Sequence, residues 1–153
     1  MNDLNQLKPQ LYQECKTIID ERISSLKNIL QETQNAANNE TKSSAGDKHE
    51  TGRAMAQLET EKLNAQLGEA LKVKQTLATI NPIQLASNIV LGSVVFTNKG
   101  NFYIAISIGK IEIDNEQFFA ISPASPIGKL LLTKKEKESF SFNGNTYIIN
   151  TIL

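Results

Sequence analysis

Apolar residues recur at spacings of three and four residues near the start of the chain, among mostly polar neighbours. This spacing puts the apolar side chains on one face of a helix, as in a coiled-coil seam. We expect this helix to run from about Pro9 to Asn35, with Pro9 in its first turn, where a missing N–H costs nothing. The predicted seam consists of Leu11, Cys15, Ile18, Arg22, Leu26 and Leu30, with Ile19 and Ile23 beside it.

A second stripe with the same spacing predicts a second helix from about Gly52 to Ile80. The residues between the two stripes lose the apolar periodicity and are rich in Asn, Ser and Thr. An apolar stripe needs a partner, so we expect the two helices to form an antiparallel hairpin with its tip near residues 40–52. A parallel dimeric coiled coil is the alternative, although an interruption at mid-length suits a monomeric hairpin better. The second stripe consists of Ala56, Leu63, Leu67, Ala70, Leu77 and Ile80.

From Asn88 onward the chain becomes β-branched and aromatic, which predicts strands. The pairs Lys99-Gly100 and Asn143-Gly144 are typical of tight turns between strands. Within residues 122–133, Ser125 is a candidate cap and Pro126 a candidate first residue for one short helix. The predicted fold class is therefore α+β, a helical hairpin followed by a small antiparallel β domain. The strands are expected at 88–98, 101–109, 110–114, 117–122, 139–143 and 145–153.

The change in composition also predicts the domain organisation. We expect a helical hairpin domain over residues 1–80, a linker over 81–88 that contains Pro82, and a C-terminal domain over 89–153.

Composition excludes several classes of protein. The 153 residues carry 16 basic and 16 acidic side chains, so no net charge attracts nucleic acid or an anionic membrane. The single cysteine, Cys15, excludes an intrachain disulfide. No apolar run has the length of a membrane span, and the first ten residues lack the apolar region of a signal peptide. We therefore expect a cytoplasmic protein.

Two stretches of the sequence carry a resemblance to a known family. One is Val-Leu-Gly-Ser-Val-Val at 90–95 followed by Ser-Pro-Ala-Ser-Pro-Ile-Gly at 122–128, and the other is Gly-Asp-Lys-His-Glu-Thr at 46–51. With these motifs the chain resembles the Gre family of bacterial transcript-cleavage factors. The resemblance implies an FKBP-like C-terminal domain that docks on RNA polymerase, with the hairpin entering the secondary channel. The implied docking residues are Ser122, Pro123, Ser125, Pro126, Ile127 and Gly128.

The same resemblance assigns the chemistry to two carboxylates at the tip. Asp47 and Glu50 fall on the catalytic Asp and Glu of the family motif. They would share Mg²⁺ with the polymerase and stimulate cleavage at the 3′ end of backtracked nascent RNA. Mg²⁺ takes one or two protein carboxylates together with phosphates and waters, so we expect no tightly bound metal and no enzymatic activity in the isolated chain.

Other interpretations of the same residues remain open. Asp47 and Glu50 also have the spacing of a capping box, which needs no catalysis. Thr51, Arg53 and Ala54 depart from the family pattern, which favours a non-cleaving regulator that occupies the polymerase channel. A peptidyl-prolyl isomerase is disfavoured by the short C-terminal half and the absence of Trp. The Ser-Pro-Ile-Gly segment argues against a coiled-coil adaptor with no polymerase contact.

Overall fold

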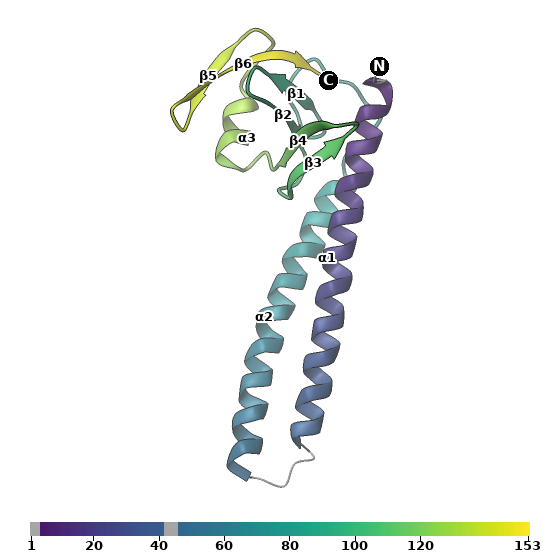
Figure 1. Ribbon diagram of the computed structural model, residues 1–153, viewed down its shortest axis with the longest axis vertical. Helices are drawn as coiled ribbons and strands as arrows, with labels where there is room; N and C mark the ends of the chain where they lie inside the picture. The colour runs from purple at the N-terminus through teal and green to yellow at the C-terminus, as the bar shows by residue number, and fades with distance from the viewer. Residues whose placement is uncertain (1–3, 42–45) are drawn as a thin grey trace. The chain divides into compact units, whose positions relative to one another are not determined.

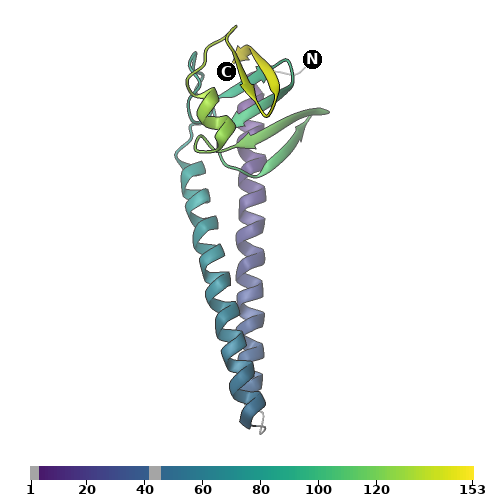
Figure 2. The same cartoon turned by 90° about the vertical axis from the view of Figure 1, so that its left-hand side faces the viewer.

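Two long helices precede a small β domain. The computed structural model describes the backbone of residues 4–41 and 46–153 and the side chains of residues 4–39 and 50–153. Helices α1 (Leu4–Thr41) and α2 (Gly46–Ala78) run side by side in opposite directions (Figures 1 and 2). Six strands and a short helix make up the described part of the β domain. The predicted α+β class and the antiparallel pair of helices are confirmed.

Both helices begin earlier than predicted, and α2 ends at Ala78, two residues before the predicted end at Ile80. α1 begins at Leu4, so Pro9 lies inside the helix, and the prediction that it occupies the first turn is wrong. Pro9 cannot donate a hydrogen bond to the carbonyl four residues before it, which costs stability. Burial offsets this cost, because Leu7 and Leu11, on either side of Pro9, are both buried.

The chain divides into two compact units, Ile19–Lys74 and Met1–Ile18 together with Gln75–Leu153. In the first unit the helices bury Ile23 and Leu30 of α1 and Leu63 and Ala70 of α2. Arg22, which we expected in the seam, is exposed, because Ile19 and Ile23 occupy the buried face. The predicted boundary at residues 81–88 follows composition rather than compactness and stays a prediction.

The strands of the β domain form one sheet in the order β3-β4-β2-β1-β6-β5. Neighbouring strands are antiparallel except β2 and β4, which are parallel because the β3–β4 hairpin returns the chain to the edge of β2. Helix α3 (Pro126–Leu131) connects β4 to β5. The strands are β1 (Val94–Thr97), β2 (Gly100–Ile104), β3 (Gly109–Ile113), β4 (Glu116–Ile121), β5 (Ser139–Phe142) and β6 (Asn145–Ile152).

Several strands are shorter than predicted, and local hydrogen bonds explain the first of them. Before β1, the Ser93 hydroxyl accepts from the N–H of Val90 and donates to the carbonyl of Asn88. These bonds hold residues 88–93 in a turn, which Gly92 completes with a φ of 97°.

The turns differ from the prediction in one place. The turn at Asn143-Gly144 is confirmed, with φ values of 51° and 80°. The β1–β2 turn lies one residue earlier than predicted, because Thr97 pairs with Gly100.

The core of the β domain lies on one face of the sheet, where α3 packs. Phe140 and Tyr147 extend it with stacked rings whose centroids lie 5.0 Å apart. Tyr103 is buried, and Tyr12 and Cys15 of α1 are among the groups that raise its pKa, which puts them close to it. The buried members of the core are Ile89, Val95, Phe102, Ile104, Leu131, Phe140, Ile149 and Ile152.

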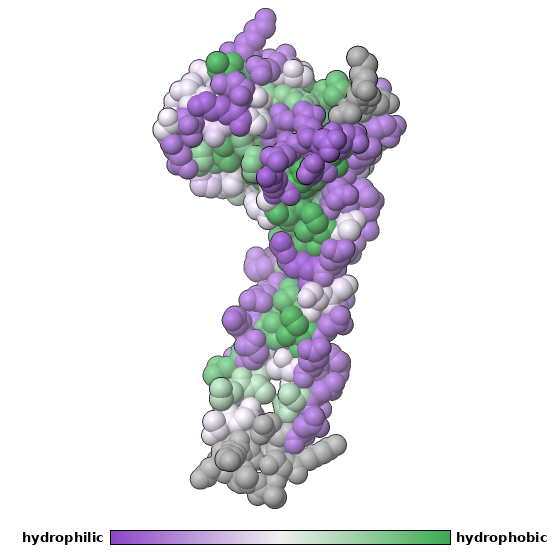
Figure 3. Space-filling model, viewed as in Figure 1, coloured by the Kyte–Doolittle hydropathy of each residue, from purple (hydrophilic) through white to green (hydrophobic). Residues whose placement is uncertain are grey.

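On the face that Figure 3 shows, the helices are mostly polar, with apolar patches between the polar side chains. Among residues 4–41 and 46–153, no helix combines the length and the apolar character that crossing a membrane requires.

Candidate functional site at the end of the helical pair

The predicted tip residues lie where α2 begins. α1 ends at Thr41 and α2 begins at Gly46, so Asp47 falls in the first turn of α2 and Glu50 in the next. We expected this motif in the tip between the two helices, with the second helix beginning at about Gly52, whereas the motif lies within the first turns of α2. The side chain of Asp47 lies outside the described residues, whereas Glu50 is exposed. Residues three apart lie on one face of a helix, so positions 47 and 50 share a face of α2.

A capping box needs Asp47 just before the first helical residue, whereas α2 already begins at Gly46. The first N–H groups of a helix lack partners within the helix, and the helix dipole favours negative charge there. Negative charge at positions 47 and 50 is therefore favourable near the start of α2 even without a metal. The helix start by itself does not separate the two roles.

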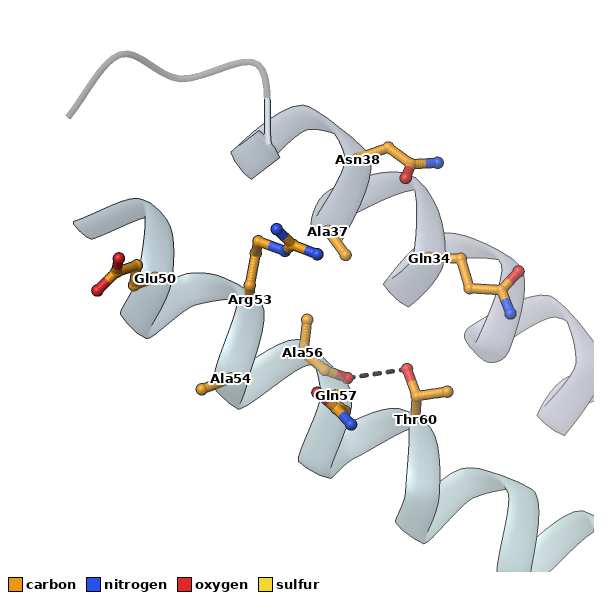
Figure 4. Close-up of a pocket in the computed structure, with 9 residues that line it drawn as sticks. All are labelled: Gln34, Ala37, Asn38, Glu50, Arg53, Ala54, Ala56, Gln57 and Thr60. Carbon is orange, nitrogen blue, oxygen red and sulfur yellow. Dashed lines mark hydrogen bonds between the residues drawn. The ribbon is translucent and has the colours of Figure 1, made fainter. Parts of the chain in front are cut away.

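Next to the tip, the two helices enclose an open groove of about 540 Å³. The packed seam ends at Leu30 and Leu63, and the residues beyond it that face the groove are small or polar. Figure 4 shows the groove between the ends of α1 and α2, with Ala37 facing Ala56. The lining residues are Gln34, Ala37, Asn38, Glu50, Arg53, Ala54, Ala56, Gln57 and Thr60.

Arg53 gives the groove its charge. Its guanidinium extends between the helices toward Ala37, whereas the carboxylate of Glu50 points away from the groove (Figure 4). Arg53 makes no hydrogen bond or ion pair with a described residue, while Thr60 donates to the carbonyl of Ala56 at 2.8 Å. Arginine presents a planar fork of donors that suits carboxylate and phosphate groups. Arg53 therefore offers the groove donors of the kind that suit an anionic group, and no residue that lines the groove is a nucleophile held by a base.

The described residues offer no complete metal site. Within the part of the chain that the structure describes, no group of three or more His, Cys, Asp or Glu side chains could hold a metal ion. Asp47 and Glu50 supply carboxylate oxygens, the donor type that Mg²⁺ prefers, but two carboxylates are too few to hold it tightly. A metal at this tip would need further ligands from another molecule.

The predicted docking segment is held together by its own hydrogen bonds. Ser125 caps α3, because its hydroxyl accepts from the N–H of Gly128 at 3.1 Å. The same hydroxyl donates to the carbonyl of Ser122 at 2.6 Å. The hydroxyl of Ser122 accepts from the N–H of Ala124 at 3.0 Å, and Pro126 occupies the first turn of α3. The cap and the helix predicted here are confirmed.

Gly128 has a structural reason to be glycine. A Cβ at this position would lie 2.2 Å from the carbonyl oxygen of Ser122 and 2.8 Å from the Ser125 hydroxyl. Of the six implied docking residues, Pro126 is exposed, Gly128 is buried and the others are partly buried. Much of this motif is therefore explained by the fold, and the surface around Pro126 is what a partner could contact.

The sequence did not predict the groove. The sequence signal for the groove is that small or polar residues replace large apolar ones along both helical stripes. These residues are Gln34 and Ala37 after Leu30, and Ala56 and Thr60 before Leu63. This loss of periodicity marks the end of a packed seam, but spacing does not say whether the helices stay in contact beyond it.

Comparisons with known proteins identify no relative: no protein family, no curated protein and no solved structure matches the chain.

Proposed function

We propose that the chain is a transcription elongation factor that binds RNA polymerase, inserts its helical hairpin into the secondary channel and stimulates cleavage of backtracked RNA. One observation carries the proposal. The motif Gly46-Asp47-x-x-Glu50 lies at the start of α2, at the end of an antiparallel pair of helices. A hairpin that presents carboxylates at its end suits delivery of these groups into a narrow channel. The order of hairpin and β domain, and the resemblance of the 122–128 segment, support the same proposal.

The two carboxylates would act inside the polymerase. In a two-metal mechanism, Mg²⁺ activates the attacking water and stabilises the leaving oxygen. Asp47 and Glu50 would contribute oxygen ligands to this site, and the polymerase and an RNA phosphate would supply the others. Asp47 and Glu50 both lie on helical backbone at the start of α2, which limits the entropy lost when they bind. The chain would thus be a cofactor of the polymerase, without activity alone, and would work in the cytoplasm on the 3′ end of nascent RNA.

Docking would reside in the C-terminal domain. The residues that we propose for it are Ser122, Pro123, Ser125, Pro126, Ile127 and Gly128. Ser125 and Gly128 shape this surface through the cap of α3, while the exposed ring of Pro126 is available for contact.

A non-cleaving regulator of the same channel is the second candidate, and Arg53 favours it. This cation lies one helical turn beyond Glu50 and extends into the groove. Positive charge near a cleavage site competes with Mg²⁺ for carboxylate and phosphate oxygens. Such a protein would occupy the channel and alter initiation or pausing without supplying metal ligands.

Co-purification with RNA polymerase from the native host tests what the two candidates share. Both require stable binding to the core enzyme, and both fail if the full chain does not bind. Transcript cleavage by stalled complexes then separates them, because only the first candidate accelerates it.

A further inference from the structure

Lys8 is a buried cation near the start of α1. Its side chain and backbone together are only 3% exposed. The ammonium donates to the carbonyl oxygen of Gln84 at 2.6 Å, a residue far along the chain. This bond ties the segment after α2 to α1. Burial lowers the pKa of Lys8, because the protein surroundings stabilise the charged form less than water does.

The described residues leave this charge without a counter-charge. No described carboxylate lies within ion-pair distance of Lys8, and among the described groups burial is what lowers its pKa. A lysine ammonium has three donors, and among the described groups it has one acceptor, the Gln84 carbonyl. Buried charges in proteins are normally paired, because an unpaired one costs several kcal/mol. This burial therefore calls for a further partner.

A small, partly enclosed pocket lies beside the ammonium. Its volume is about 130 Å³, and Lys8 lines it together with Asn81, Gln84 and Gly92. The side-chain oxygen of Asn81 already accepts from the N–H of Ile83 at 3.2 Å. The amide nitrogen of Asn81 thus remains as a second donor, with no acceptor among the described residues. The pocket combines a buried cation, a neutral donor and space for an ion of a few heavy atoms.

We propose that this pocket binds a small oxyanion of the size of acetate or phosphate, with Lys8 as its charged partner. The Lys8 ammonium supplies the charge and Asn81 a further hydrogen bond. The anion completes the hydrogen bonding of Lys8 and strengthens the link between α1 and residues 81–92. Lys8 and residues 81–92 belong to the same compact unit. Binding would therefore stabilise the fold of that unit.

Two features of the chain compete with a bound anion. The carbonyl end of α2 carries partial negative charge, and it lies beside the pocket at Thr79. Asp3, which lies outside the described residues, is a carboxylate close to Lys8 in sequence. Either could neutralise Lys8 without a ligand, and the experiment below separates these possibilities from the proposal.

The test is equilibrium unfolding of the full chain in urea, at constant ionic strength, with acetate or phosphate replacing chloride. Linkage predicts that an anion at ten times its dissociation constant lowers the unfolding constant about tenfold. We expect a saturable response to at least one of the two oxyanions, and none in Lys8→Met, which keeps most of the side chain's length. Lys27→Met, on the exposed side of the same helix, should respond like the wild type. The relative response to acetate and phosphate identifies the preferred oxyanion.

The outcomes that overturn the proposal are specific. An equal response in the wild type and Lys8→Met would mean that the anions act elsewhere. No response in the wild type up to 100 mM, on the order expected for weak sites, would mean that the α2 carbonyls neutralise Lys8. A response that appears only in Asp3→Asn would mean that the Asp3 carboxylate, rather than a bound anion, neutralises Lys8 in the wild type. If Lys8→Met does not fold, amide chemical shifts of the wild type decide, because the proposal requires saturable changes at residues 79–92.

Discussion

Asp20 of α1 and Lys74 of α2 form an ion pair of 2.7 Å that joins the two helices. Lys74 lies far from Asp20 in sequence, so the pair fixes the antiparallel register as well as adding attraction. Both side chains are partly exposed, and such pairs contribute about 0.2–1 kcal/mol. We predict a coupling energy in this range from a double-mutant cycle with Asp20→Asn and Lys74→Met, measured by urea unfolding.

Salt provides the control for this pair. The coupling should weaken between low salt and about 1 M salt, where the screening length falls to about 3 Å. The exposed pair Glu69–Lys72, 3.5 Å apart within α2, should show a smaller coupling. A coupling of zero between Asp20 and Lys74 at low salt would show that apolar packing alone sets the register.

Of the glycines whose surroundings the structure describes, Gly128 should be the least tolerant of substitution. Gly128→Ala puts a methyl group 2.2 Å from the Ser122 carbonyl, so the start of α3 must shift. Overpacking of this kind costs about 1–3 kcal/mol. Gly68→Ala is the matched control, because it lies in α2 with nothing within 4 Å of the added methyl, and it should stabilise by about 0.5–1 kcal/mol. Equal effects in the two variants would contradict the close packing at the α3 cap.

Ionisation of Cys15 and Tyr103 should lower the stability of the folded chain in alkali. Burial raises the pKa of Cys15 from 9.0 to about 12 and also raises the pKa of Tyr103. Both groups ionise at a lower pH in the unfolded chain than in the folded chain. Their contribution to the free energy of unfolding is therefore complete below pH 9 and declines as the pH rises toward 12. The decline should not exceed about 1.4 kcal/mol per pH unit for each group. Urea unfolding between pH 8 and 11 measures it.

Tyr103→Phe is the variant that isolates one of these groups. It keeps the ring and removes a hydroxyl that is buried without a hydrogen-bond partner among the described groups. Because an unsatisfied buried hydroxyl costs about 1–3 kcal/mol, this variant should be at least as stable as the wild type at pH 7. Its alkaline decline should also be smaller. A clear loss of stability at pH 7 would mean that the hydroxyl has a partner in solution.

The helical half of the fold was predictable because its signal is local. Leu11, Cys15, Leu30 and Leu63 recur at helical spacing, and each is buried. The position of Arg22 was predicted wrongly, because spacings of three and four are both helical and only packing selects between Ile19 and its neighbours.

In the β domain, the local sequence predicted a turn but not the order in which the strands pair. The Asn143-Gly144 turn was visible because both residues favour positive φ. The parallel pairing of β2 with β4 was not, because it depends on which sheet edge the β3–β4 hairpin returns to. The contact between Lys8 and Gln84 joins residues 76 apart in sequence, and no periodicity reports such a contact.

The candidate site was predicted as a motif rather than as a surface. Asp47 and Glu50 were chosen from their sequence, and the structure adds that they lie at the start of α2. The groove that Arg53 enters depends on how the two helices end, which Ala37 and Ala56 determine through their small size. The sequence showed those residues but not the space between them.

The most direct test of the central claim is transcript cleavage by backtracked host RNA polymerase with the wild type and Asp47→Asn, across a Mg²⁺ titration. Asn can still cap a helix, so a residue that only caps should tolerate the change. A metal ligand should lose cleavage about tenfold or more, which corresponds to about 1.4 kcal/mol of transition-state stabilisation. We predict this loss, with polymerase binding retained because the proposed docking surface lies in the C-terminal domain. Tight binding of the wild type without any stimulation of cleavage would contradict the account and assign the chain to the non-cleaving regulators.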